Sequence, residues 1–349
     1  MSNYDQFAAA VKEISGGKNV VLLDDLGLPS VYVPINKLKN SEIISGGSEN
    51  THPAFSVNGV EKSRFLYSKY QNIVINGRAY SLSHRDPKTY VNFDQARQAC
   101  EAKGAGFHLG TLAEWAAVAL LTRKMGTMPH GNNNYGGDSA YTYEKGQESA
   151  KDNNKTGRTF TGSGPATWGH DHTQFGIQDM NGNVWEWLGG MRLNEGEIQI
   201  IPYNNAALGS ECDMSASSTL WKAIKNDGSL VAPGTVATLK YDIVSGNIQL
   251  TTGITSAQDA GRGGSYTAMT LASGVTAPEL AKALILYPDE PGKDYGGDYH
   301  WMNNAGERLP VAGGGWGNGA DAGVFDLNPN NARSHSSGNI GFRSAYVEL

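Results

Sequence analysis

Histidine and cysteine are the residues of this chain that could hold a catalytic or redox-active metal. His170 and His172 are two positions apart, so in a strand both imidazoles would point to one face. A metal site needs at least one further ligand, and no third histidine stands at a convincing spacing. We therefore interpret the two as loop histidines. A metal-dependent oxidase or oxygenase that uses His170, His172 and a remote ligand stays open as the alternative.

The two cysteines, Cys100 and Cys212, limit the sulfur chemistry further. Two cysteines exclude a disulfide scaffold and a four-cysteine zinc site. They could pair with each other, but Cys100 lies in a helical pattern. This position favours a buried free thiol.

Other common motifs for catalysis or nucleotide binding are absent from the sequence. It contains no Gly-x-Ser-x-Gly nucleophile motif and no glycine loop that leads into a helix. The stretch GGGWGNG at residues 313–319 leads into more loop and would hold a phosphate poorly. The net charge is -6 and no basic run is present, which argues against a nucleic-acid partner.

The sequence also bears on the cellular compartment. The first residues, MSNYDQFAAAVKEISGG, have neither a basic region nor a long apolar stretch, so we expect no signal peptide. The longest apolar run, residues 116–121, is far too short to span a membrane. We expect synthesis and folding in a cytoplasm, from which a particle released by lysis could carry the protein out.

The elements that must position any site begin with a short N-terminal unit. Residues 4–14 predict a helix that stops at two glycines. Two β-rich runs within residues 20–35 flank a Gly-Leu-Pro turn and predict a hairpin. The loop at residues 45–53 has the composition of a boundary. We predict an accessory domain at 1–48 and a main domain at 49–349.

The main domain has an α+β pattern. Residues 64–70 and 72–82 predict short strands, and Asn92 is placed to cap a first helix. Thr111 and Glu114 have the spacing of a capping box at the start of a second helix. Long loops rich in glycine and asparagine follow this helix.

The stretch 192–300 differs from its surroundings in its residue pattern. Strand-like runs such as EGEIQII and NIQLTT alternate with polar loops, and one more helix is predicted near residue 278. The patterns on either side of the stretch belong together. We therefore predict a β-rich insertion within the main domain.

The stretch GIQDMNGNVWEW at residues 176–187 combines a turn at Asn181 and Gly182 with a strand that carries Trp185 and Trp187. It resembles the "GL-DM-GNVWEW" motif of the formylglycine-generating-enzyme group. FHLGTLAEWAAVA, and VAGGGW with a final GFR, resemble that group's other motifs in the same order, over roughly residues 55–349. The resemblance implies a C-type lectin fold, in which these four residues are scaffold.

The resemblance does not extend to the catalytic residues of that group. Its copper-dependent oxidase needs a pair of cysteines shortly after the position of GGGW, and no cysteine follows Cys212 here. Neither Asp nor Gly can replace a thiolate as soft ligand and redox group. We expect no enzyme activity and no cofactor. The resemblance allows a structural calcium ion near Asn181 or Asn183, although no clustered carboxylate loop indicates one.

The segment 313–343, GGGWGNGADAGVFDLNPNNARSHSSGNIGFR, is rich in small polar residues, yet apolar residues are spaced through it. It resembles the variable region of diversity-generating-retroelement proteins, a family that includes phage receptor-binding tail proteins. The resemblance implies a buried scaffold made of Trp316, Ala322, Gly323, Phe325, Ile340, Gly341 and Phe342. The polar residues between them would be exchangeable ligand contacts, namely Gly315, Gly317, Asp321, Asp326, Asn328, Asn330, His335, Ser337 and Gly338.

These observations predict a binding protein with a variable surface on a rigid scaffold. The expected ligand is a protein or a glycan on a host or bacterial cell surface. A phage tail is the expected location and the surface of a cell is the alternative. A structural virion component is the remaining hypothesis, and a homo-oligomer stays open.

Overall fold

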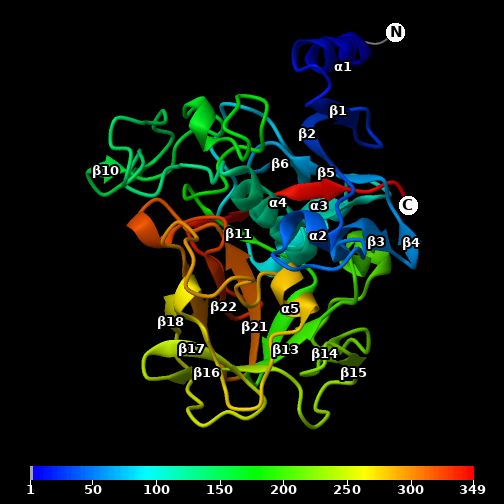
Figure 1. Cartoon of the computed structure of the whole chain (residues 1–349). Helices are drawn as coiled ribbons and strands as arrows, with labels where there is room; N and C mark the ends of the chain where they lie inside the picture. The colour runs from blue at the N-terminus through cyan, green and yellow to red at the C-terminus, as the bar shows by residue number, and fades with distance from the viewer. Residues whose placement is uncertain (1–2) are drawn as a thin grey trace.

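Most strands of the chain fall into two sheets, which the helices cover and connect (Figure 1). This computed structural model describes residues 3–349. The α-helices are α1 (Asn3–Ile14), α2 (Asn40–Ile43), α3 (Phe93–Glu101), α4 (Leu112–Met125) and α5 (Glu279–Ala283). The 3-10 helices are η1 (Pro53–Phe55), η2 (Ala166–Trp168), η3 (Asn205–Glu211), η4 (Tyr266–Ala268) and η5 (Gly319–Asp321).

The first sheet has the strand order β1-β2-β5-β24-β8, and all its neighbours are antiparallel. Its strands are β1 (Val20–Leu23), β2 (Pro29–Asn36), β5 (Arg64–Ser68), β24 (Ser344–Tyr346) and β8 (Phe107–Leu109). The C-terminal strand β24 therefore lies inside the sheet, between β5 and β8. This pairing fixes the end of the chain firmly in the fold.

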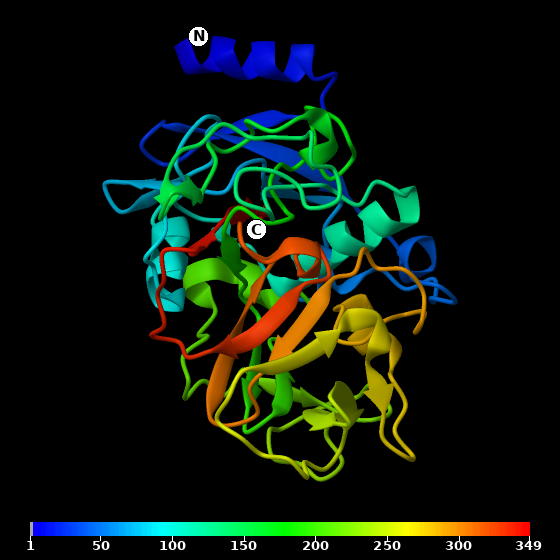
Figure 2. The same ribbon diagram turned by 90° about the vertical axis from the view of Figure 1, so that its left-hand side faces the viewer.

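The N-terminal prediction is correct in its elements and wrong in its boundary. The helix is present as α1 and the hairpin as β1 and β2. However, β2 pairs with β5 from Tyr32 to Asn36, and Ile43 and Ile44 belong to the main hydrophobic core. Residues 20–44 are therefore part of the main domain rather than of an accessory domain. By contrast, α1 has no buried residue and stands away from the body at the top of Figure 2.

Both predicted helix starts carry the expected caps. Asn92 Oδ1 accepts a hydrogen bond from the Gln95 amide at 2.9 Å, and Gln95 Oε1 accepts one from the Asn92 amide at 3.0 Å. The same reciprocal pair joins Thr111 and Glu114 at the start of α4. Trp115 in the first turn of α4 is fully buried, and the residues after it up to Leu120 are buried too. Helix α4 therefore runs through the core, and its first half is covered on all sides.

The second sheet has the order β18-β20-β22-β21-β12-β13-β16-β17-β19 among the described residues, with β11 and β23 joined beside β21. The strands before the insertion's loops are β11 (Trp185–Trp187), β12 (Met191–Asn194) and β13 (Glu197–Ile200). Those within the insertion are β14 (Lys222–Ile224), β15 (Leu230–Val231), β16 (Lys240–Val244), β17 (Asn247–Thr251), β18 (Arg262–Ser265) and β19 (Thr270–Leu271). The last are β20 (Tyr299–Met302), β21 (Glu307–Ala312), β22 (Leu327–Asn331) and β23 (Ile340–Phe342).

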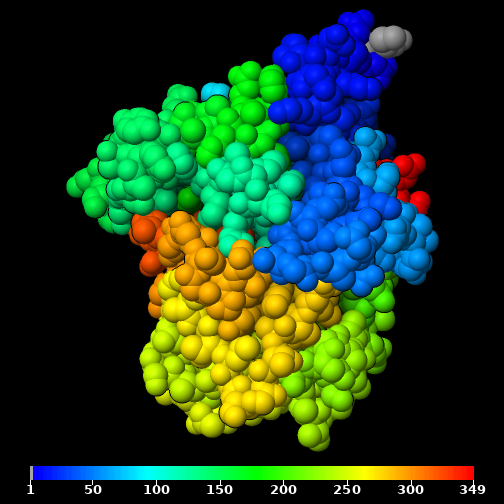
Figure 3. All heavy atoms as spheres, viewed as in Figure 1, coloured from blue at the N-terminus to red at the C-terminus, as the bar shows by residue number. Residues whose placement is uncertain are grey.

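The stretch 192–300 forms the lower half of the molecule in Figure 1 and shares its sheet with the strands that follow. In the space-filling view its yellow and orange atoms pack directly against the blue N-terminal third (Figure 3). His52 Nε2 lies 2.8 Å from the carbonyl oxygen of Ala283, and Asn40 Nδ2 donates to Glu279 at 2.7 Å. The stretch is thus continuous with the rest of the fold in both sheet and core.

Three short hairpins and a long loop region complete the fold. The hairpins are β3 (Ser56–Val57) with β4 (Val60–Glu61), β6 (Ile73–Ile75) with β7 (Arg78–Tyr80), and β9 (Lys151–Asp152) with β10 (Lys155–Thr156). Between α4 and β11 the chain is mostly loop, and it is held by buried amides such as Asn132 and Asn183. Within residues 3–349, no helix has the length and apolar character to cross a membrane.

Candidate ligand-binding surface

The segment 313–343 crosses one face of the molecule. In Figure 2 it runs in orange-red to red between the green loops above and the yellow insertion below. Strand β22 pairs with β21 and β20, and β23 pairs in parallel with β11. Phe325 and Phe342 are fully buried, and Trp115 Nε1 donates to the Val324 carbonyl oxygen at 2.7 Å. A segment of loop-like composition is therefore anchored at both ends and in the middle.

Arg343 anchors the end of the segment to the β11 motif. Its guanidinium is fully buried, and Nη2 and Nε donate to the two carboxylate oxygens of Glu186 at 2.5 Å each. The remaining donors reach the carbonyl oxygens of Ser68 and Gln178 at 3.1 and 3.0 Å. Burial would lower the pKa of Arg343, but the Glu186 carboxylate outweighs it and the pKa is raised. Arg343 therefore stays charged, and its contacts with Glu186 and Ser68 join both sheets.

The other predicted scaffold residues lie mainly inside. Trp185 is 5% exposed, and Trp187 is fully buried and donates from Nε1 to the Val91 carbonyl oxygen at 3.0 Å. Gly182 has a φ of +75°, and a Cβ there would lie 2.2 Å from the Asn132 carbonyl oxygen. Glycine is thus required at this turn. Ala322, Gly323, Ile340 and Gly341 are also buried.

Trp316 and Asn181 complete the predicted scaffold. Trp316 is half-buried rather than buried, and its Nε1 donates to Asp152 Oδ2 at 3.1 Å. Asn181 is 9% exposed and donates from Nδ2 to the Pro129 carbonyl oxygen at 2.9 Å. Trp316 therefore forms part of the surface as well as part of the scaffold.

Seven of the nine predicted contact positions reach the surface. Gly317, Asp321 and His335 are exposed, and Asn328, Asn330, Ser337 and Gly338 are half-buried. They lie in three places: beside and in η5, along β22, and in the loop between β22 and β23. Asn328 and Asn330 are two positions apart on β22 and so share one face of the strand.

Asp326 and Gly315 do not lie where they were predicted. Asp326 is fully buried and neither carboxylate oxygen has a hydrogen-bond partner among the described residues. It stands directly before Leu327, where the chain turns into β22, so the alternation of the strand does not apply to it. Burial, with the nearby Asp298 and Asp321, raises the pKa of Asp326 well above its usual range. Gly315 is buried against Trp185. Neither residue can present a side chain to a ligand.

Aromatic residues outside the segment flank the exposed positions, and no local pattern in the sequence predicts this. A Cβ on Gly338 would lie 2.8 Å from the Tyr90 hydroxyl, and one on Gly317 would lie 3.2 Å from that of Tyr135. Tyr299 and Trp301 on β20 have ring centroids 4.6 Å apart, and β20 is the neighbour of β22. The alternation of YHWM could have placed these two on one face, but their nearness to β22 depends on the sheet order.

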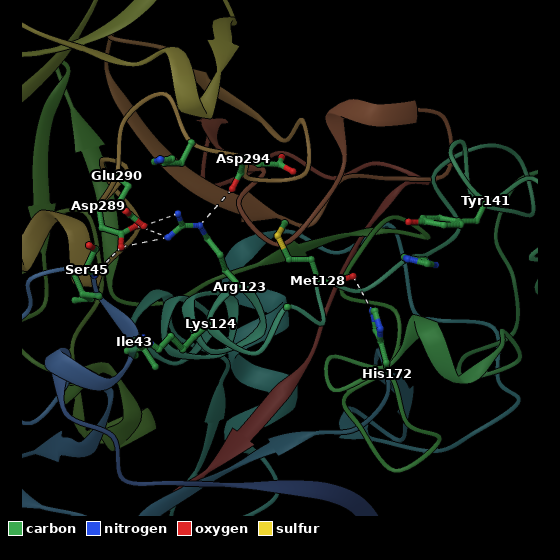
Figure 4. Close-up of a pocket in the computed structure, with 14 residues that line it drawn as sticks. Ile43, Ser45, Arg123, Lys124, Met128, Tyr141, His172, Asp289, Glu290 and Asp294 are labelled. Atoms are coloured by element: carbon green, nitrogen blue, oxygen red, sulfur yellow. Dashed lines mark hydrogen bonds and ion pairs between the residues drawn. The ribbon is translucent and has the colours of Figure 1, made fainter.

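Two adjoining clefts lie next to this surface. The larger, about 660 Å³, is lined by α2, the end of α4 and residues 289–294 (Figure 4). Arg123 reaches across its wall to Asp289 and Glu290, at 3.2 and 2.8 Å. The smaller, about 240 Å³, lies between residues 128–141 and residues 320–324. Met128, His130 and Tyr141 line both clefts, so the two form one continuous depression.

The two histidines considered as metal ligands are used as structural groups. His170 is 5% exposed and its Nδ1 accepts from the Ile177 amide at 2.9 Å, and burial lowers its pKa to about 4. His172 Nε2 lies 2.9 Å from the Met128 carbonyl oxygen. Over residues 3–349 there is no group of three or more His, Cys, Asp or Glu side chains arranged to hold a metal.

The amides considered for calcium are also engaged. Asn183 Oδ1 accepts from the Thr159 amide at 2.8 Å and from Asn132 Nδ2 at 3.2 Å. Asn181 Oδ1 accepts from Asn133 Nδ2 at 3.2 Å. Protein donors occupy both oxygens, and within residues 3–349 no group of three or more acidic, histidine or cysteine side chains is arranged to hold a metal. This arrangement therefore does not fit a calcium ion.

The cysteines are separate, buried thiols. Cys100 is fully buried and Cys212 is 1% exposed, and neither forms a disulfide. Burial raises the pKa of Cys212 to about 11 and that of Cys100 further still. At neutral pH both are protonated, so neither is an activated nucleophile or a ready metal ligand.

Comparison with known proteins gives one family and several remote likenesses. Residues 34–270 match the model of the sulfatase-modifying factor enzyme 1-like domain family. No curated protein sequence matches the chain. Three solved structures are similar at low identity. Treponema denticola variable protein 1 has 13% identity and a TM-score of 0.34, and the match covers 94% of this chain and 98% of that one. PvdO from Pseudomonas aeruginosa has 13% identity and a TM-score of 0.38, with 94% of this chain and 97% of that one covered. The Major Tropism Determinant U1 variant has 11% identity and a TM-score of 0.32, with 90% of this chain and 62% of that one covered. Likeness at these TM-scores supports no argument about function.

Proposed function

The chain belongs to the sulfatase-modifying factor enzyme 1-like family, and within it we propose a ligand-binding protein whose variable surface is diversified by a retroelement. Its α+β fold is the C-type lectin fold of the formylglycine-generating-enzyme type. The proposal concerns the use that this chain makes of the fold, since a fold by itself does not determine function.

The observation that supports the proposal is that residues 313–343 consist of buried apolar residues, which anchor the segment, and of exposed polar residues between them. Residues such as Phe325, Ile340 and Phe342 are buried and hold the segment to the two neighbouring strands. The exposed and half-buried polar residues between them lie at η5, on β22 and in the loop before β23, within the segment whose ribbon crosses one face of the molecule in Figure 2. A surface of this kind tolerates exchange of its side chains while the scaffold stays folded. The resemblance to retroelement variable regions supports the same conclusion from the sequence.

The proposed ligand is a macromolecule on the surface of a host or bacterial cell, and the proposed location is a virion, as part of a phage tail. Asp321, His335 and Gly317 offer little apolar area, so a single copy would bind weakly. Display in several copies would raise the overall affinity about a hundredfold or more where the sites can engage together. The flanking Tyr90 and Trp301 would add the aromatic anchors that the segment lacks.

Binding of labelled protein to a panel of bacterial strains, measured by flow cytometry, tests this function. Two chains would be compared that differ at Asp321, Asn328, His335 and Ser337 and nowhere else. We expect both to melt at the same temperature and to bind different strains. Equal binding to the same strains by both chains would contradict the variable-surface function. An adenine-rich near-copy of the last codons beside a reverse-transcriptase gene would independently support diversification.

An enzyme of the same family is the second candidate, because the family itself includes enzymes by its description. The chain has no cysteine after Cys212, and both of its thiols are buried. We therefore expect no turnover of a cysteine-containing sulfatase peptide in the presence of copper. Turnover that is lost in a Cys212→Ser variant would favour the enzyme instead.

A further inference from the structure

The smaller cleft joins a loop outside the variable segment to the segment itself. One wall is formed by residues 128–141, and the opposite wall by Ala320, Ala322 and Gly323. Asp298, which directly precedes β20, lies at the base against Gly323. We call this space the carboxylate cleft. A ligand group that enters the cleft contacts the variable segment and the loop of residues 128–141 at the same time.

Two carboxyl groups line the carboxylate cleft, and burial raises the pKa of one of them, Asp298, to about 8. Asp138 and Asp298 line it, and no lysine or arginine does. Asp138 accepts hydrogen bonds from the amides of Gly131, Ala140 and Tyr141 at 2.8 to 3.0 Å. The acidic lining of the cleft therefore favours the binding of a positively charged group and disfavours that of a negatively charged one.

Asp298 has a hydrogen-bond partner in the described chain at one of its two carboxyl oxygens. It is 2% exposed, and its Oδ2 accepts from the Phe325 amide at 2.7 Å. No hydrogen bond joins its Oδ1 to another of the described residues, although the side chain lines the cleft. Asp326, fully buried and unpartnered at both oxygens, lies behind the same turn. A buried carboxylate without a full set of partners is costly, and a cationic donor would offset that cost.

The cleft also offers an aromatic wall. Tyr141 stacks on His130 with ring centroids 3.7 Å apart and an angle of 9° between the planes. Tyr141 is 41% exposed, so one face of its ring is available. A cation near the face of a tyrosine ring is attracted by the ring quadrupole. The carboxyl groups at the bottom of the cleft and the aromatic ring at its side together favour a cationic group at the end of an apolar chain.

We propose that the carboxylate cleft binds the charged end of an arginine or lysine side chain of a protein partner. The cleft volume of about 240 Å³ accommodates one such side chain. A neutral glycan would bring no positive charge to the Asp298 carboxylate, so above the pKa of Asp298 the cleft favours a protein over a glycan. The proposal rests on the binding function proposed above and adds a fixed anchor point beside the exchangeable contacts.

A metal ion fits the cleft less well. Asp138 already accepts from three amides, which leaves Asp298 as the carboxylate with a free oxygen. Calcium takes six to eight oxygen ligands and usually several carboxylates. No metal-capable group of three or more acidic, histidine or cysteine side chains occurs in the described chain. An ammonium or guanidinium needs fewer partners and provides its own hydrogen-bond donors.

The experiment uses Nα-acetyl-arginine methylamide as the probe and the full chain as the target. Amide chemical shifts are followed by NMR as the probe is added at pH 8.5. We expect saturable shifts at Gly296, Gly323 and Tyr141, with a dissociation constant in the millimolar range. Nα-acetyl-citrulline methylamide has nearly the same shape without the charge, and we expect it to bind at least tenfold more weakly.

Two variants separate the cleft from the overall charge. Asp298→Asn should weaken binding of the arginine probe at least tenfold, while Asp213→Asn, an exposed residue with the same change of charge, should not. Equal binding of the citrulline probe, or unchanged binding to Asp298→Asn, would overturn the proposal. Calcium chloride that shifts the same amides and excludes the probe would identify a metal site instead and would also overturn it. Neither result bears on the strain-binding test, which changes other residues.

Discussion

Glu186 and Arg343 form an ion pair whose side chains are 1% and 0% exposed, and this pair joins β11 to the residue that follows β23. The two residues belong to the WEW and GFR motifs, which are more than 150 positions apart in the sequence. The last motif is therefore not a loose end. It is the point at which the variable segment is fixed to the scaffold, and this explains how a loop-rich segment can be held in one conformation.

Arg343→Met should destabilise the protein strongly. The substitution leaves the Glu186 carboxylate buried without its partner, and such a loss costs about 3–5 kcal/mol. The free energy of unfolding, measured by urea denaturation, checks this. Lys37→Met removes an exposed pair with Glu61 and should change it by about 1 kcal/mol or less. Similar losses in the two variants would mean that Arg343 is not a structural anchor.

Exchange of the exposed contacts should leave stability almost unchanged. Asp321, Asn328 and His335 lie at the surface or half-buried, and surface substitutions usually cost within about 0.5 kcal/mol each. The triple variant with Ser, Ser and Phe at these positions should therefore have nearly the same melting temperature as the original chain, while it binds a different ligand. Thermal melts give the answer directly.

Phe325→Ala is the matched control within the same segment. Phe325 is fully buried against Tyr266 and Tyr295, with ring centroids 5.4 and 4.9 Å away. Its truncation should cost about 3–5 kcal/mol. A triple variant that unfolds as readily as Phe325→Ala would show that the polar residues are structural, and the division of labour would not hold.

Local signals predicted the local features of this fold well. The cap at Asn92 and the capping box at Thr111 each depend on residues close in the sequence, and each is present as predicted. The motif order gave the fold type, because the motifs are the positions where strands meet. The burial of Trp187 and Phe342 follows from the same motifs.

Long-range relationships explain what the sequence could not show. The pairing of β2 with β5 placed residues 20–44 in the main sheet, although the loop after them looked like a boundary. Asp326 stands between the apolar residues Phe325 and Leu327, which suggested an outward position, yet it precedes the strand and turns inward. The carboxylate cleft needs Asp138 and Asp298 in the lining of one cleft, and residues so far apart in the sequence give no local signal for that.

The contribution of Asp298 and Asp326 to stability should fall as the pH rises from about 4 to about 8. Burial raises the pKa of Asp298 to about 8, and that of Asp326 is raised as well. Both carboxyls bind a proton more tightly in the folded chain than in the unfolded one, so their contribution is complete at low pH and is lost through this window. Asp298→Asn removes one of the two. The difference in unfolding free energy between the original chain and this variant should decline by up to about 1.4 kcal/mol per pH unit. Parallel pH profiles would contradict the raised pKa.

Binding of the arginine probe should depend on pH in the opposite direction. The cation binds the ionised form of Asp298, whose pKa of about 8 in the free protein leaves most of the carboxyl protonated at pH 6. Each unit below pH 8 should therefore weaken the apparent affinity about tenfold, and the affinity should level off above pH 8. Other titratable groups face or adjoin the same space, namely His130, Asp138, Tyr141, Asp294, Asp321 and Asp326.

Protonation of His130 would also repel the probe, so a His130→Gln variant belongs in the measurement. The variant keeps a polar side chain at the cleft but cannot become charged. If the steep dependence between pH 6.5 and 8 persists in His130→Gln, it comes from the buried carboxyl. If the dependence disappears, the histidine controls it, and Asp298 is ionised before the cation arrives. Isothermal titration in buffers of different ionisation enthalpy would count the protons released. We expect close to one per bound probe near pH 7.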